Sequence, residues 1–298
     1  MTAETQRSPA PVASAADVAP ASSASAASGP AITIDHVSMT FLGRDAAQSV
    51  HALDDVSLAI RKGEFVCLLG PSGCGKSTLL GIVGGMLTPT AGTVAVAGAP
   101  VKRPRPHDIA YVFQESTLLP WYTVIENFRL ALKFQGIDDS SWRERAMQAL
   151  SAVGMEQFAN HYPKQLSVGM KQRINLARGM CLETDILLLD EPFAALDEQT
   201  RMVLGEDLSL LLARRGKTIV FVTHSLAEAV FLADRIIVMT ARPGRVKASI
   251  IVPQPHPRSP DFMLTEEFGK IRNDLYALLR DEIRATVARM REARDARG

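Results

Sequence analysis

A glycine-rich run with one lysine and two hydroxyl residues is the strongest chemical signal in the chain. It reads Gly70-Pro71-Ser72-Gly73-Cys74-Gly75-Lys76-Ser77-Thr78, follows the apolar run at residues 65–69 and opens a helical stretch. Glycines let backbone N–H groups converge on phosphate oxygens, the helix start adds the positive end of its dipole, and Lys76 supplies a cation for the β- and γ-phosphates. Ser77 offers a hydroxyl ligand to Mg²⁺. The run predicts a nucleotide phosphate site, shared by kinases, GTPases, helicases and transporters.

Two other apolar runs end in polar groups. Asp190 and Glu191 follow residues 186–189, and His224 follows residues 218–223. The carboxyl ends of parallel strands meet at one sheet edge, so these groups are expected beside Lys76. We expect Asp190 to hold Mg²⁺ through water, Glu191 to polarise the attacking water, and His224 to contact the γ-phosphate. The alternatives are a solvated acidic turn and a surface histidine.

The elements that must position these residues predict an α/β fold. Short β-rich runs occur at residues 32–34, 56–60 and 65–69, and further apolar runs at residues 186–189, 218–222 and 235–239. Helical periodicity dominates between them, from about residue 123 to residue 153. We therefore expect a P-loop NTPase core with a mostly parallel sheet, an N-terminal antiparallel β subdomain, and an α-helical subdomain inserted at about residues 115–180.

The two ends of the chain differ from this central domain, which we place at residues 30–253. Residues 1–29 are mostly Ala, Ser and Pro and predict a disordered tail, either an inert extension or a tether. Residues 254–298 begin with a Pro-rich linker and continue as a predicted amphipathic helix that packs on its own domain or contacts a partner. The apolar residues of that helix are Leu264, Phe268, Ile271, Leu275, Leu278, Ile283, Val287 and Met290.

Composition disfavours several classes of protein. In 298 residues, 33 Lys and Arg nearly balance 32 Asp and Glu, so a formal net charge of +1 disfavours nucleic-acid binding. Cys67, Cys74 and Cys181 have no metal-ligand spacing and fit a reducing compartment. No stretch reaches the about 18 to 20 apolar residues of a membrane span, and the N-terminus lacks the apolar region of a secretory signal. We expect a cytoplasmic protein that other chains would have to connect to a membrane.

Further motifs, in this order along the chain, resemble the ABC ATPase family from about residue 31 to residue 253. The diagnostic segment is Leu166-Ser167-Val168-Gly169-Met170-Lys171-Gln172-Arg173, which resembles the family's signature motif. Gln114 matches the Q-loop, and Ala195-Leu196-Asp197 matches the D-loop. Phe41 falls where the family usually keeps an aromatic residue that stacks on adenine. Val168 departs from the family, which prefers glycine there, and implies a slower site or pairing with a non-identical subunit.

The resemblance implies a head-to-tail dimer with ATP and Mg²⁺ as cofactors. Each ATP would lie between the P-loop of one subunit and Ser167 and Gly169 of the other, with Asp197 also at the nucleotide. Glu191 would be the general base or the group that orients water, and His224 would bridge to the γ-phosphate. Gln114 would sense the nucleotide, help to hold Mg²⁺ and contact the membrane subunit.

A single such domain without a membrane span implies two ATPase subunits, identical or paralogous, beneath separate permease chains at the cytoplasmic face of the inner (plasma) membrane. Residues 118–127 resemble the groove by which importer ATPases grip a permease, although they could equally be core. Residues 60–80, 220–237 and 241–244 are similar to ATPases of nitrate, sulfonate and taurine importers, which implies an extracytoplasmic solute-binding protein as an indirect partner. The alternatives are a soluble ABC ATPase of repair or assembly and a metabolic P-loop kinase.

Overall fold

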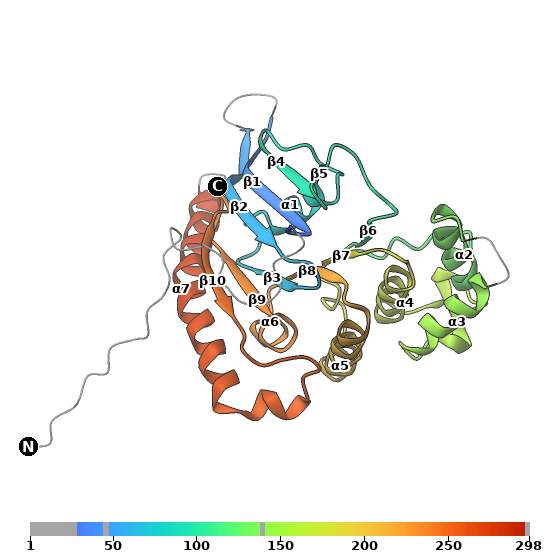
Figure 1. Ribbon diagram of the computed structural model, residues 1–298. Helices are drawn as coiled ribbons and strands as arrows, with labels where there is room; N and C mark the ends of the chain where they lie inside the picture. Colours follow the sequence, from blue (N-terminus) through green and yellow to red (C-terminus); the bar gives the residue numbers. More distant parts are fainter. Residues whose placement is uncertain (1–28, 44–47, 138–140, 296–298) are drawn as a thin grey trace, which may run out of the picture.

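Two sheets form the centre of the molecule (Figure 1). The computed structural model describes residues 29–43, 48–137 and 141–295, so the predicted tail lies outside the described residues except for Gly29. The strands are β1 (Ile32–Phe41), β2 (Val50–Ile60), β3 (Phe65–Leu69), β4 (Ala91–Val96), β5 (Ala99–Pro100), β6 (Ile109–Val112), β7 (Ile186–Asp190), β8 (Thr218–Thr223), β9 (Arg235–Met239) and β10 (Val246–Ile251). The helices are α1 (Lys76–Val83), α2 (Val124–Phe134), α3 (Trp142–Ser151), α4 (Val168–Met180), α5 (Glu198–Arg215), α6 (Leu226–Leu232) and α7 (Glu266–Asp295).

The larger sheet has the order β10-β9-β3-β8-β7-β6. Its strands from β9 to β6 are parallel, and only β10 runs antiparallel to its neighbour. Every residue of β3, β7 and β8 is buried, which explains why these strands contain continuous apolar runs instead of alternating apolar and polar residues. The predicted mostly parallel sheet is confirmed. Because β3, β8 and β7 are neighbours, the loops that follow them meet at one edge.

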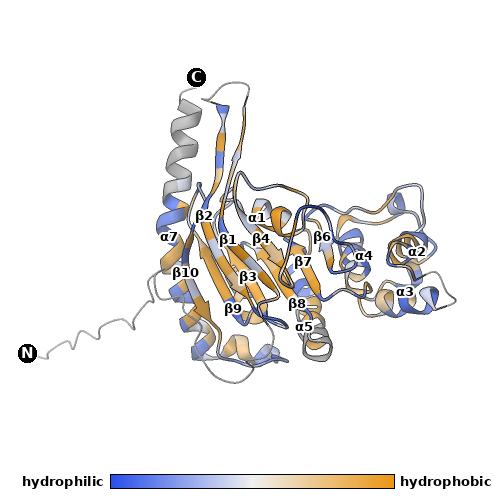
Figure 2. Cartoon of the chain, turned by 45° about the horizontal axis from the view of Figure 1, so that its top comes forward, coloured by the Kyte–Doolittle hydropathy of each residue, from blue (hydrophilic) through white to orange (hydrophobic). Residues whose placement is uncertain are grey.

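The smaller sheet is antiparallel, with the order β2-β1-β4-β5, and confirms the predicted N-terminal β subdomain. Side chains of β3 alternate between two cores. Val66 and Leu68 face a cluster that includes Leu79 and Leu80 of α1 and the inner face of the small sheet. Phe65, Cys67 and Leu69 face a second cluster, built with α6, α7 and the helical segment. The apolar strands of both sheets are visible in Figure 2.

The segment between β6 and β7 carries α2, α3 and α4, which lie at the opposite end of the molecule from α7 (Figures 1 and 2). The first of them begins where Thr123 N donates to Glu126 Oε2 at 2.7 Å, a bond that satisfies a backbone group outside the helix. The side chains of Phe128 and Leu132 are fully buried against Leu150 of α3 and its neighbours. The helical periodicity of residues 123–153 therefore reflects apolar contacts between α2 and α3.

The C-terminal helix α7 packs on its own chain through part of the predicted stripe. Phe268, Ile271 and Leu275 are buried, together with Leu279. The assignment of two residues to the stripe is wrong. Leu264 is 86% exposed, because it precedes the helix in a short 3-10 turn, and Ile283 is 45% exposed. The side chains of Val287 and Met290 lie outside the described residues. Among the described helices, none combines the length and apolar composition needed to cross a bilayer.

Candidate nucleotide site

A cavity of about 760 Å³ opens at the sheet edge where β3, β7 and β8 end. Its lining combines the glycine-rich loop with polar groups from four other loops, one residue of β1 and two residues of β2. The lining residues are Phe41, Val50, Ala52, Ser72, Gly73, Gly75, Lys76, Ser77, Thr78, Gln114, Glu191, His224 and Arg242. Ten of these thirteen were predicted for the site, which leaves Val50, Ala52 and Arg242 as additions. The predicted residues that do not line it are Gly70, Pro71, Cys74, Asp190, Ser167, Gly169 and Asp197.

Glycines at two positions of the loop are required by its backbone. Gly73 has φ 74° and Gly75 has φ 99°, in the left-handed region that side chains disfavour. A Cβ at position 75 would also lie 2.8 Å from the carbonyl oxygen of Ala52. Helix α1 begins directly after this turn, at Lys76, so the unpaired N–H groups of its first turn border the cavity. This arrangement suits an anion.

The ammonium of Lys76 lies inside the loop. Its Nζ donates to the carbonyl oxygens of Gly70 at 2.9 Å and Pro71 at 3.0 Å, and lies 3.8 Å from Cys74 Sγ. The residue is only 5% exposed yet lines the cavity. Gly70, Pro71 and Cys74 therefore form the inner wall that holds the cation, which explains why they do not reach the cavity themselves. A charged lysine held this way can meet a phosphate with little reorganisation.

Ser77 and Asp190 meet beneath the loop. Ser77 Oγ donates to Asp190 Oδ1 at 2.9 Å, and the Tyr111 hydroxyl donates to Oδ2 at 3.4 Å. Burial raises the pKa of Asp190, against the lowering effect of the Ser77 hydrogen bond. Burial also raises the pKa of Tyr111, with the charge of Asp190 adding to it. Sequence reasoning missed Tyr111 as a partner of this carboxylate.

This pair fits Mg²⁺ in the presence of a nucleotide. A hydroxyl and a carboxylate are the hard oxygen donors that Mg²⁺ takes in small number, with phosphate oxygens and water completing its shell. In the part of the chain that the structure describes, no three His, Cys, Asp or Glu side chains form a metal site by themselves. Gln114, the third predicted ligand, instead directs its amide nitrogen to Glu191. Coordination by its oxygen stays a prediction.

Two predicted side chains converge on the carboxylate of Glu191. Gln114 Nε2 lies 3.4 Å and His224 Nδ1 3.3 Å from Glu191 Oε2. The Glu191 backbone has φ 44°, unusual for a residue with a side chain, and its N–H donates to Val222 O at 3.0 Å. A neighbouring strand thus holds the strained residue in place, and such strain is characteristic of functional sites. The carboxylate is positioned to accept a hydrogen bond from water in the cavity.

Phe41 forms the aromatic wall of the cavity at the end of β1. It is 40% exposed, and Val50 and Ala52 of the adjacent strand line the same space. Phe41 was predicted for the site, whereas Val50 and Ala52 were not, because the register that pairs Phe41 with Val50 is not visible in the sequence. An exposed aromatic face beside apolar side chains is suited to stacking with a planar base.

The segment that resembles a signature motif lies outside this cavity. Ser167 caps α4, its Oγ accepting from Met170 N at 3.2 Å, and Val168 is 67% exposed. A Cβ at Gly169 would lie 3.4 Å from the side chain of Leu196. Asp197 caps α5 by accepting from Thr200 N at 2.9 Å, a hydrogen bond that lowers the Asp197 pKa. The single chain therefore does not bring Ser167, Gly169 or Asp197 to the phosphate loop's cavity.

Comparison with known proteins decides the family. The family described as ABC transporter matches residues 53–194. An uncharacterized ABC transporter ATP-binding protein of Methanocaldococcus jannaschii, MJ0412, is 44% identical, covering 78% of this chain and 86% of its own. The chain belongs to the ABC transporter ATP-binding proteins. This ABC ATPase is also 41% identical to the taurine import ATP-binding protein TauB of Rhizobium johnstonii, over 89% of this chain and 99% of that one.

Solved structures agree with this assignment. The ABC ATPase resembles the dimeric structure of MJ0796, a bacterial ABC transporter cassette, with a TM-score of 0.69 and 34% identity over 75% of this chain and all of the other. A second structure of that cassette, a dimer in a post-hydrolysis state bound to ADP and Pi, gives a TM-score of 0.68 at 34% identity. The P-loop NTPase fold and the ATPase activity expected from the sequence are confirmed.

The ABC ATPase contains one polar link that sequence reasoning missed. Arg201 of α5 donates through Nη2 to Leu196 O at 2.9 Å, and its Nη1 lies 3.5 Å from Glu228 Oε1. Thr223 Oγ1 in turn donates to Glu228 Oε2 at 2.5 Å. Burial raises the pKa of Glu228, against the lowering effect of the Thr223 bond. The link ties the loop before α5 to the strand end that carries His224.

Proposed function

We propose that this ABC ATPase powers a solute importer by closing against a second ATPase subunit on ATP and Mg²⁺. The observation that carries the proposal is the convergence of Gln114 and His224 on Glu191 at the mouth of the phosphate-loop cavity. Ser167 and Gly169 lie outside that cavity, as expected of groups that complete the site of another copy. The dimeric structure of a similar cassette supports the same arrangement.

Each side chain has a role in this mechanism. Lys76 and the N–H groups around Gly73 and Gly75 bind the phosphates. Ser77, Asp190 and Gln114 would hold Mg²⁺, which neutralises part of the charge on the transferred phosphate.

Hydrolysis itself depends on the cluster around Glu191. The carboxylate orients the attacking water and takes its proton while ADP leaves, and His224 contacts the γ-phosphate. Loss of the γ-phosphate removes what joins the half-sites, so the two subunits separate.

The importer assignment rests on whole-length similarity. The chain aligns with 99% of the taurine import protein and, at 38% identity, with 95% of the nitrate import ATP-binding protein NrtD of Synechocystis. We propose a small anion such as nitrate, a sulfonate or taurine as the solute. The partners are permease subunits, a second identical or paralogous ATPase subunit and, indirectly, a solute-binding protein. The assembly lies at the cytoplasmic face of the inner membrane and involves no nucleic acid.

Exposed aromatic side chains support the permease contact. Trp121 is 68% exposed and Tyr122 36%, in the loop just before α2. Leu118, earlier in the same segment, is buried. The segment is therefore held in the core by Leu118 and presents an aromatic surface through Trp121 and Tyr122.

The test is Glu191→Gln in the purified chain. The amide keeps the size of the side chain and cannot accept the proton, so ATP turnover should fall at least about 100-fold while ATP binding persists. With ATP and Mg²⁺ the variant should elute as a dimer in size-exclusion chromatography, and as a monomer without ATP. Lys76→Ala, which lacks the phosphate cation, should stay monomeric. A Glu191→Gln chain that hydrolyses ATP at the normal rate would refute the assignment.

A further inference from the structure

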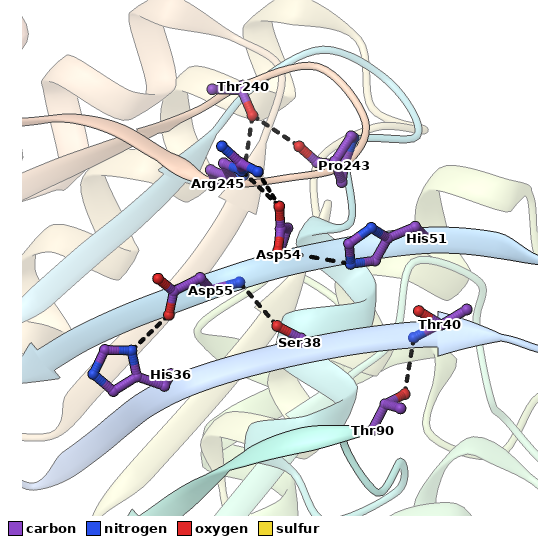
Figure 3. Close-up of polar contacts among 10 residues, drawn as sticks. All are labelled: His36, Ser38, Thr40, His51, Asp54, Asp55, Thr90, Thr240, Pro243 and Arg245. Atoms are coloured by element: carbon purple, nitrogen blue, oxygen red, sulfur yellow. Dashed lines mark hydrogen bonds and ion pairs between the residues drawn. The ribbon is translucent and has the colours of Figure 1, made fainter.

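The turn at residues 240–245, between β9 and β10, forms part of the cavity rim and contributes Arg242 to its lining. Figure 3 shows this turn from the side of β2: Thr240 Oγ1 donates to Pro243 O at 3.0 Å, and Arg245 pairs with Asp54 of β2. Backbone hydrogen bonds strengthen the same junction, with Gly244 N donating to Ala52 O at 2.9 Å and Asp54 N to Gly244 O at 3.0 Å. The turn is thereby fixed to the small sheet.

The same turn is packed directly on the phosphate loop. A Cβ at Gly244 would lie 2.0 Å from Cys74 O, so the two backbones are in contact with no room for a side chain. Arg242 Nε donates to Gly73 O at 3.0 Å. Gly73 and Arg242 both line the cavity, so this hydrogen bond joins the turn to the phosphate loop at the cavity wall.

Helix α7 holds the turn from a third side. Ala241 N donates to Glu282 Oε2 at 2.7 Å, and Lys247 Nζ donates to Glu282 Oε1 at 2.7 Å. The carboxylate thus joins the backbone immediately before Arg242 to β10. With β2, the phosphate loop and α7 all bonded to the turn, the position of the Arg242 backbone beside the cavity is determined by the fold.

We propose that Arg242 binds the phosphates of the nucleotide as a second cation, outside the loop, while Lys76 binds from within it. This inference rests on the proposed nucleotide site. A guanidinium keeps its charge at any physiological pH and has the donor geometry that phosphate oxygens match. Arg242 lines the cavity and its Nε already donates to a carbonyl oxygen of the loop, so its side chain has little conformational freedom to lose when phosphate binds. The C-terminal helix becomes a support of the nucleotide site.

A positioning role predicts different behaviour. If Arg242 only held the loop through Gly73 O, then any donor at that position would suffice and charge would be irrelevant. Gln at position 242 keeps an N–H donor and removes the charge, whereas Lys keeps the charge and changes the donor geometry. The two variants therefore separate binding of phosphate from support of the loop.

The experiment is equilibrium titration of the full chain with ATP, at two salt concentrations. Arg242→Ala and Arg242→Gln should each weaken ATP binding about tenfold, within the range of a lost hydrogen bond to a charged group, and Arg242→Lys should recover most of it. The salt dependence should be shallower for Ala and Gln than for wild type. Arg61→Ala removes an exposed arginine that lies outside the turn and does not line the cavity, and should bind ATP within about twofold of wild type.

Three results would overturn the inference: wild-type affinity in Arg242→Ala, wild-type affinity in Arg242→Gln, or equal losses in the Gln and Lys variants. Melting temperatures without nucleotide show whether each variant is folded, and the Gln and Lys variants remain decisive if the alanine variant is not. Lys76→Ala separates failure of the Arg242 proposal from failure of the nucleotide site. If it loses ATP binding while the Arg242 variants do not, the second cation is refuted and the site stands. If Lys76→Ala binds normally, the nucleotide site itself is refuted.

Discussion

At the scale of one residue, the buried carboxylate of Asp190 lowers the stability of the folded chain. The carboxylate ends a fully buried strand, is only 6% exposed, and has hydroxyl donors from Ser77 and Tyr111 as partners. Burial raises its pKa above the usual range. The ionised form therefore costs the nucleotide-free chain stability, a cost that binding of a cation would remove.

Asp190→Asn tests this cost through its pH dependence. A carboxyl group whose pKa is raised in the folded chain stabilises it only while protonated, and that stabilisation disappears as pH rises through the raised pKa. The neutral amide should therefore melt about 2 to 4 °C above wild type at pH 8, and the difference should narrow as pH falls toward 4.5. Melting curves across this range provide the measurement. A variant that is less stable at pH 8, or a gap that does not change with pH, would contradict the account.

At the scale of elements, strands and loops could be predicted from local sequence, whereas contacts between residues far apart in the chain could not. The run Phe65–Leu69 and the glycine-rich loop could be identified because their residue types match a buried strand and a phosphate turn. Arg242 could not be assigned to the nucleotide from the sequence, because it lies 169 residues from Gly73 and reaches it through the pairing of β3 with β9. Tyr111 was missed for the same reason, being 79 residues from its partner Asp190.

Only part of the apolar stripe predicted for α7 is buried. Periodicity predicted an amphipathic helix but assigned Leu264 and Ile283 to its apolar stripe, where the structure exposes them. Periodicity cannot tell where a helix begins or how far along it the partner surface extends. Here the buried part runs from Phe268 to Leu279, and the remaining described side chains of the helix are more exposed.

Adjacent residues of α7 test whether this helix is part of the core. Leu275 is fully buried in the larger apolar cluster, and Tyr276 beside it is 56% exposed. Leu275→Ala should lower the free energy of unfolding by about 2 to 5 kcal/mol, and the melting temperature by about 5 °C or more. Tyr276→Ala should change the free energy of unfolding by less than about 0.5 kcal/mol. Equal effects in thermal denaturation would show that α7 does not pack as described.

At the scale of the whole molecule, the residues predicted to act on ATP lie in two separate places. The cavity contains the phosphate loop, the cluster around Glu191 and the wall formed by Phe41, whereas Ser167 and Gly169 lie elsewhere on the same chain. Ser167 caps a helix whose first turn offers N–H groups to an anion, and the neighbouring Val168 is exposed. Two chains arranged head to tail would supply each other's missing part.

The most direct measurement is a structure of the Glu191→Gln chain with ATP and Mg²⁺. The account predicts a two-fold dimer in which the γ-phosphate bound to Lys76 of one subunit lies within about 2.7 to 3.2 Å of Ser167 Oγ or the Gly169 N–H of the other. A closed, ATP-bound pair in which Ser167 is remote from both nucleotides would contradict it.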